Sequence, residues 1–211
     1  EDKSINGTTA KANTNKTSGV QTAVNNANIN ASNGVYIFSN EATNADINVA
    51  QGSVGLVGVN VSVGIAEVTD NVGVSMNGAN ITGSAVNVIT NSTGDLKVDN
   101  TQGAVGAGAV NVAYSKLTHG GNNAITVDGS TLKATGAVQD NQPTLLIETD
   151  SEVNMTNKLH GVAVGGVAAG AMVGNTISSG NAAVTIGNIA SANTFIGEAV
   201  GVYANNTPTV K

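Results

Sequence analysis

The sequence predicts an all-β protein, a right-handed parallel β-helix (β-solenoid) whose coils stack along one axis. Three observations predict this fold: a long repeat, alternation of β-branched with small residues, and a composition poor in charge and aromatic rings. The stretch QGSVGLVGVNVSV at 51–63 returns at 102–114 as QGAVGAGAVNVAY, with seven of thirteen positions identical. Repeats of this length are typical of solenoids, which bury a continuous core by stacking similar units.

The composition favours stacked coils over a β-sandwich or a closed barrel. Hydrophobic residues make up 40% of the 211 residues, whereas charged residues make up 10% and aromatic residues 2%. A sandwich or barrel of this size uses aromatic side chains in its core, but a solenoid is filled by ladders of small and aliphatic side chains. The apolar content and the low charge also differ from those of disordered chains.

The repeat indicates four copies of one unit. MNGANITGS at 76–84 matches VDGSTLKAT at 127–135 at the same 51-residue offset, and a looser copy, HGVAVGGVAAGAMVG, begins at His160. We expect an irregular stretch or partial coil at 1–20, followed by a single β-solenoid over 21–211. Repeats of about 51–58 residues are expected at 51–101 and 102–159, with a partial copy before them at about 21–50 and a degenerate one after them at 160–211. Because the pattern is cut at both ends, we expect the chain to be a piece of a larger protein.

The coil length is left open between two values. Each repeat would form two coils of roughly 25 residues or three of roughly 17, and at ~4.8 Å per coil the stack would be a rod roughly 40–55 Å long.

The strands are predicted from period-2 alternation and the turns from Gly, Asn and Asp. Val59, Val61, Val63 and Ile65 alternate with Asn60, Ser62 and Gly64, and shorter alternations occur at 35–38 and 72–75. We expect the aliphatic members to form the inward ladders. Turns are predicted at the polar clusters TDN (69–71), NG (77–78), NSTGD (91–95), GGNN (120–123), DGS (128–130) and DNQP (140–143).

Charge and cysteine content exclude several classes of function. The net charge is −6, arginine is absent, and the eight lysines are scattered along the sequence. A nucleic-acid surface needs a basic face, so we expect no nucleic-acid partner. No apolar run approaches the ~18 residues of a membrane span, and the absence of cysteine excludes a disulfide scaffold and a thiolate zinc site. We expect no cofactor.

The two histidines are expected to be structural. His119 lies in THGGNN, which we interpret as a turn. His160 occupies the repeat position held by Gln51 and Gln102 in other copies. A position that accepts either Gln or His is not typical of a catalytic or metal-binding residue.

Three carboxylates stand out in this weakly charged chain. Glu148, Asp150 and Glu152 alternate in IETDSEV, so a regular strand would project them to one face. They are candidate calcium ligands, although a solvated outer face or an edge that discourages stacking is the interpretation we favour. We expect no catalytic residue, because a polysaccharide lyase would also need clustered basic groups and sugar-stacking aromatics.

Tyr36 and Phe38 are the candidate partner-binding residues. They lie on one face of VYIF, opposite Val35 and Ile37. We favour an aromatic stack within the fold or beneath a loop, and the alternative is an exposed patch that binds a partner.

The repeats resemble a known family. VGLVGVNVSV (54–63) and VGAGAVNVAY (105–114), each followed by Asn/Thr-rich strands, are similar to the repeat region of large filamentous-haemagglutinin-type exoproteins, and most of all to leukotoxin-like filamentous adhesins of Gram-negative bacteria. The resemblance covers the chain from about residue 20 to its end. It implies two-partner secretion through an outer-membrane transporter, a location outside the cell or on the bacterial surface, and a role in virulence.

The function expected from this resemblance is mechanical. The chain would be a nonenzymatic, rigid stalk that also presents a surface to a host-cell receptor or glycan. Three alternatives remain: a β-helix enzyme that degrades polysaccharides, an ice-binding or purely structural solenoid, and a toxin whose activity lies elsewhere in the full protein. The family's secretion domain has no candidate in this sequence, so the transporter would be a partner of the full-length protein.

Overall fold

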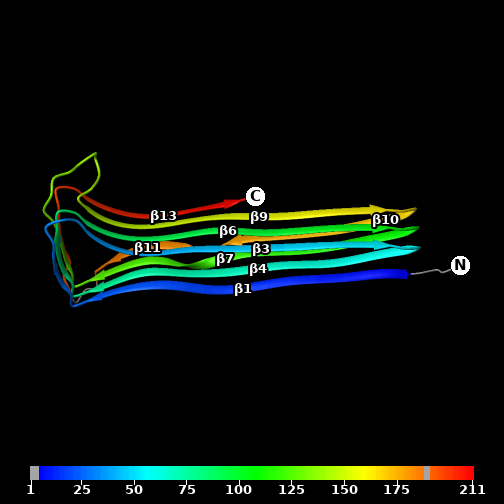
Figure 1. The fold of residues 1–211 in the computed structure, drawn as a ribbon, viewed down its shortest axis with the longest axis horizontal. Coiled ribbons are helices and arrows are strands. Elements are labelled where there is room, and N and C mark those ends of the chain that lie inside the picture. The colour runs from blue at the N-terminus through cyan, green and yellow to red at the C-terminus, as the bar shows by residue number, and fades with distance from the viewer. Residues whose placement is uncertain (1–4, 188–190) are drawn as a thin grey trace.

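The computed structural model describes residues 5–187 and 191–211 and has no helix within those ranges. Pairing between strands is parallel throughout, and Gln139 and Gln142 form an isolated antiparallel bridge. The strands form three parallel sheets, and each coil contributes to all three; in the fourth coil the strand of one long sheet is divided into two, β10 (Val167–Ser178) and β11 (Asn181–Ile186) (Figure 1). The structure therefore confirms the all-β parallel β-helix.

Two long sheets and one short sheet build the coil. The first long sheet contains β1 (Ile5–Asn25), β4 (Val57–Asn77), β7 (Gly108–Asp128), β10 (Val167–Ser178) and β11 (Asn181–Ile186). The short sheet contains β2 (Asn28–Asn30), β5 (Asn80–Gly83), β8 (Thr131–Ala134) and β12 (Thr194–Ile196). The second long sheet contains β3 (Val35–Val54), β6 (Val86–Val105), β9 (Leu145–Val164) and β13 (Val200–Val210).

Each repeat makes one coil, so the expectation of two or three coils per repeat is wrong. A coil consists of a long strand, a short strand and a second long strand, and the 51-residue offset is the register between neighbouring coils: Val57 pairs with Gly108, and Val86 pairs with Leu145. The first coil already begins in β1 at Ile5, which pairs with Val57, so residues 5–20 form regular strand. Residues 1–4 of the expected irregular stretch lie outside the described residues.

The molecule is a flattened solenoid, and its long dimension differs from the one expected. A 21-residue strand spans roughly 70 Å, whereas four coils stacked at ~4.8 Å rise only about 14 Å. Figure 1 shows β1, β3, β4, β6, β7 and β9 lying side by side along the whole length, while β10, β11 and β13 each cover part of it; the short strands lie at one end and tight turns at the other. The rod of 40–55 Å along the stacking axis is therefore wrong, because three of the six polar clusters lie inside continuous strands and the coil is longer than expected.

Three of the expected turns lie inside strands. TDN, NSTGD and GGNN fall within β4, β6 and β7. The two long sheets face each other like the layers of a sandwich, and several polar side chains of these clusters point into the interior between them. Asp70 and Ser92 are buried there, and Asn123 Nδ2 donates a hydrogen bond to the backbone oxygen of Asp150 at 2.6 Å. Turns do occur at the other three clusters, where Gly78, Gly129, Asp140 and Asn141 have positive φ angles.

The interior between the long sheets alternates between apolar and polar layers. One apolar cluster lies beside the short sheet and includes Met76, Ile81, Ile125 and Leu145. A second lies further along the long strands and includes Leu117. Between them is a polar layer formed by the side chains of Ser18, Thr43, Asp70 and His119.

The face assignment of one predicted strand is inverted. In β4 the even-numbered residues point inward, so Asn60, Ser62 and Gly64 are buried while Val59 and Val63 lie on the outer face. The buried amides are satisfied by a ladder across coils. Thr8 Oγ1 donates to Asn60 Oδ1 at 2.5 Å, and Asn60 Nδ2 donates to Asn111 Oδ1 at 3.1 Å. These hydrogen bonds offset the desolvation free energy of the buried amides. The valines that alternate with them therefore lie on the outer surface.

Candidate binding surface

The outer face of the second long sheet, next to the short sheet, carries the exposed aromatic side chains. Tyr36 and Phe38 project outward from β3, and their exposed fractions are 64% and 66%. The favoured interpretation, an aromatic stack inside the fold or under a loop, is wrong. Val35 and Ile37 point inward as expected, and Ile37 joins the apolar cluster beside the short sheet. Because inward side chains alternate with outward ones, burial of Ile37 places both rings in solvent.

A third aromatic residue, Tyr203, lies on the same face. Strand pairing places Phe38, Ile89, Glu148 and Tyr203 in one row across β3, β6, β9 and β13. The neighbouring row contains Tyr36, Asn87, Leu146 and Gly201. We call the two rows, together with Gln142 and Pro143 of the preceding loop, the aromatic face.

Each tyrosine of the aromatic face is the last residue of the same tripeptide, GVY, at 34–36 and at 201–203. In each copy the ring lies back over the glycine. A Cβ atom on Gly34 would lie 2.9 Å from Tyr36 Cε2, and one on Gly201 would lie 2.7 Å from Tyr203 Cε2. The Gly201 Cβ would also lie 3.0 Å from Pro143 Cγ. The two glycines thus let the rings lie close along the sheet surface.

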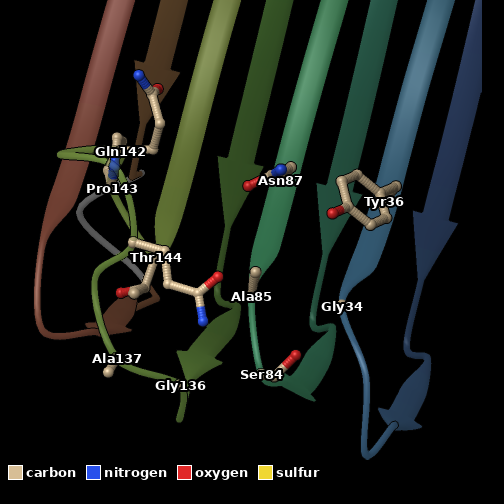
Figure 2. A pocket seen from close by; sticks show the side chains of 11 residues that line it. Gly34, Tyr36, Ser84, Ala85, Asn87, Gly136, Ala137, Gln142, Pro143 and Thr144 are labelled. Carbon is tan, nitrogen blue, oxygen red and sulfur yellow. The ribbon is translucent and has the colours of Figure 1, made fainter.

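Two hollows flank Tyr36. The larger, about 350 Å³, lies between Tyr36 and the loop before β9, with Asn87 between them (Figure 2). Its wall on the loop side is formed by Gln142, Pro143 and Thr144. The smaller hollow, about 270 Å³, is lined by Tyr36, Ile37, Phe38, Ser39, Asn40, Asn87, Ile89 and Asn91. The hollows therefore combine ring faces with amide side chains.

Of the three predicted carboxylates, Glu148 lies within this face, and Asp150 and Glu152 follow it along the same strand. Glu148, Asp150 and Glu152 all project outward from β9, as the alternation predicts. Asn205 Nδ2 donates a hydrogen bond to Glu148 Oε1 at 3.2 Å. Successive outward positions on a strand are separated by about 7 Å, which keeps the carboxylates apart. Within the described ranges, no group of three or more acidic or histidine side chains is arranged to hold a metal ion.

The histidines lie at positions that the sequence did not predict. His119 is not in a turn: it is an interior residue of β7, and its Nε2 lies 3.3 Å from Asp70 Oδ2. His160 does not take the glutamine position. Strand pairing aligns Gln51 and Gln102 with Gly161, and His160 lies opposite Thr101 on the exposed face. The sequence alignment was one residue off, and a one-residue shift moves a side chain to the other face.

Tyr203, Asn87 and Gln142 were not among the predicted site residues. Tyr203 had a signal in the sequence, the second GVY tripeptide. Asn87 had none, because it is one of many asparagines in alternating strands. Gln142 comes from the loop that lengthens the third repeat, and only the folded coil brings that loop beside Tyr36.

Comparisons with protein-family models, curated proteins and solved structures found no match. In the part of the chain that the structure describes, no helix is long and apolar enough to cross a membrane.

Proposed function

We propose that the chain is a rigid β-helical stalk segment of a large bacterial filamentous adhesin, secreted or held at the cell surface, that also presents a host-cell-binding surface. The resemblance of its repeats to filamentous-haemagglutinin-type and leukotoxin-like exoproteins supports the adhesin class. The fold supports the mechanical role. The first three coils are hydrogen-bonded in register along strands of 20 or 21 residues, and the fourth coil pairs through shorter strands; such a stack resists bending and stretching.

The aromatic face is the observation that carries the binding role. The chain has only three tyrosines and two phenylalanines. Three of these five, Tyr36, Phe38 and Tyr203, lie exposed on one face of the second long sheet. Aromatic residues are enriched where proteins bind partners and are costly to leave in water without one. A stalk with no binding role would not need them in this place.

The enzyme alternative has less support. Glycosidases use a pair of carboxyl groups that face the scissile bond from two sides. Glu148, Asp150 and Glu152 instead project in one direction from a single strand, and the side-chain amide of Asn205 donates a hydrogen bond to Glu148. We therefore propose a nonenzymatic protein. The outer-membrane transporter remains a proposed partner of the full-length protein.

The test is binding of the purified, fluorescently labelled chain to leukocytes, epithelial cells and erythrocytes, with heat-unfolded chain as the control. Saturable binding by the folded chain alone is expected. Equal binding by folded and unfolded chain, or none by either, would contradict an adhesive role and leave a stalk only. Incubation with soluble polysaccharides tests the enzyme alternative, since release of shorter sugars would contradict a nonenzymatic protein.

A further inference from the structure

We propose that the aromatic face binds an uncharged oligosaccharide, with Tyr36 as its main stacking platform. This inference rests on the proposed adhesive function and specifies the class of ligand and the place on the surface where it binds. It is carried by four features of the same surface: exposed ring faces, hollows beside them, amide side chains in the hollows, and the charge around them.

The rings offer the apolar half of sugar recognition. One face of a pyranose ring carries mainly C–H groups, which pack against the flat face of an aromatic ring. Tyr36 and Phe38 are about two-thirds exposed, at 64% and 66%, and Tyr36 forms a wall of both hollows. A ring that lies along the sheet surface over Gly34 offers a broad platform and costs little conformational entropy to hold.

The amides offer the polar half. Sugar hydroxyls both donate and accept hydrogen bonds, and so does a side-chain amide. Asn87 borders both hollows, and Gln142 lines the larger one on the loop side, at the opposite end from Tyr36 (Figure 2). The Oδ1 atom of Asn87 is covered and has no hydrogen-bond partner among the described residues. An acceptor left without a partner beside a hollow is satisfied when a ligand hydroxyl or a bridging water reaches it.

Charge favours an uncharged ligand over an acidic one. In the part of the chain that the structure describes, no lysine or arginine lines either hollow. Glu148 lies in the same row as Phe38 and Asp150 in the next row, and the chain carries a net charge of −6. Sulfated and sialylated glycans would therefore be repelled.

The geometry favours a sugar over a protein partner. A protein interface is built around a dehydrated apolar centre, whereas these hollows are lined in part by the amide side chains of Asn and Gln residues. Tyr36 is in the first coil and Tyr203 in the fourth, and they lie in neighbouring rows, so their backbones are separated by three strand spacings and a two-residue offset, or roughly 16 Å. That distance suits an oligosaccharide that crosses the strands, rather than a single sugar.

The test is an NMR titration of the ¹⁵N-labelled full chain with N-acetylchitotriose, cellotriose, maltotriose and lacto-N-neotetraose, with sialyllactose and a heparin hexasaccharide as acidic probes. We expect at least one neutral probe to shift the amide resonances of β3, β6 and the loop at 136–144. Tyr36→Ser should weaken that binding about tenfold. Gly34→Ala should also weaken it, because the added Cβ displaces the Tyr36 ring without removing it.

Tyr114→Ser is the matched control. Tyr114 projects from the outer face of the first long sheet, on the opposite side of the sandwich, so its removal should leave the affinity unchanged. An equal loss in this variant, or resonance shifts confined to other strands, would overturn the site. Binding of acidic probes alone would overturn the uncharged ligand class.

The cell-binding assay separates this inference from the proposed function. If no oligosaccharide binds but Tyr36→Ser still abolishes attachment to cells, the glycan inference is wrong and the aromatic face binds a protein. If a neutral oligosaccharide binds at Tyr36 but the folded chain attaches to no cell, the glycan site stands and the proposed host-cell adhesion is wrong.

Discussion

His119 and Asp70 form an ion pair or hydrogen bond inside the sandwich, with His119 Nε2 lying 3.3 Å from Asp70 Oδ2. Both side chains are almost completely buried, and they lie between the two apolar clusters. The other carboxylate oxygen, Oδ1, accepts hydrogen bonds from Thr43 at 2.9 Å and from Ser18 at 3.0 Å. The pair therefore joins β4 to β7, while the two hydroxyls tie the same carboxylate to β1 and β3.

Removing His119 should destabilise the fold, whereas removing His160 should not. His119→Ala takes away one partner of Asp70 and opens a cavity, so we expect a loss of about 3 kcal/mol in the free energy of unfolding. His160→Ala changes an exposed residue and should stay within about 0.5 kcal/mol of the parent. Urea denaturation followed by circular dichroism measures both values. Similar values for the two variants would mean that the buried pair contributes nothing.

Asp70 should give the fold a dependence on acid pH. Burial raises the pKa of its carboxyl group, but hydrogen bonds from His119, Thr43 and Ser18, with the charge of His119, outweigh burial and hold the pKa below its ordinary value of 3.8. A lowered pKa stabilises the folded state above pH 3.8, and this contribution is lost as the pH falls below 3.8 towards the folded-state pKa.

The comparison of the parent chain with Asp70→Asn isolates that contribution from the other carboxylates. At pH 7 the variant should be less stable by about 1–3 kcal/mol, and the difference should shrink as the pH falls below 3.8. Unfolding measured between pH 2.5 and pH 7 gives both curves. A difference that is constant over this range would show that the carboxylate charge is not involved.

A close approach between two coils should make Gly121 irreplaceable. Its φ angle is +132°, and an added Cβ would overlap the backbone oxygen of Asp70 on the neighbouring strand. Gly121→Ala should therefore cost about 3 kcal/mol or prevent folding. Gly103 is the matched control, because an added Cβ there would meet no atom within 4 Å. Thermal unfolding of Gly103→Ala should resemble that of the parent, and equal melting temperatures for both variants would refute the coil packing at Asp70.

The fold class could be predicted from the sequence because the repeat offset is itself the register between coils. Gln51 and Gln102, which opened the comparison of the repeats, are paired residues on neighbouring strands. The length of the coil could not be predicted. Clusters such as NSTGD have the composition of turns, and only the opposite sheet shows that Ser92 is buried within a continuous strand.

The candidate site was predictable only in part. Alternation showed that Tyr36 and Phe38 share a face, but the choice of face depends on which neighbours are buried. In β3 the aliphatic residues point inward, while in the first half of β4 they point outward. The same period-2 pattern is therefore compatible with either orientation of the strand. In β4 the hydrogen-bonded polar interior around Asn60 determines which residues point inward. The approach of Gln142 to Tyr36 depends on a loop whose position no local pattern specifies.

Replacing Asn111 by valine tests that polar interior, because the two possible orientations give effects of opposite sign. Asn111 Nδ2 donates to the backbone oxygen of Val162 at 2.6 Å, and its Oδ1 accepts from Asn60. Asn111→Val leaves that backbone oxygen unpaired and removes one acceptor of Asn60, so we expect a loss of about 2 kcal/mol. Were the interior aliphatic at this position, valine would stabilise the strand. The control is Asn48→Val on the exposed face of β3, which should be neutral or slightly stabilising. Chemical denaturation of the two variants decides between the orientations: stabilisation of the chain by Asn111→Val would refute the buried amide ladder.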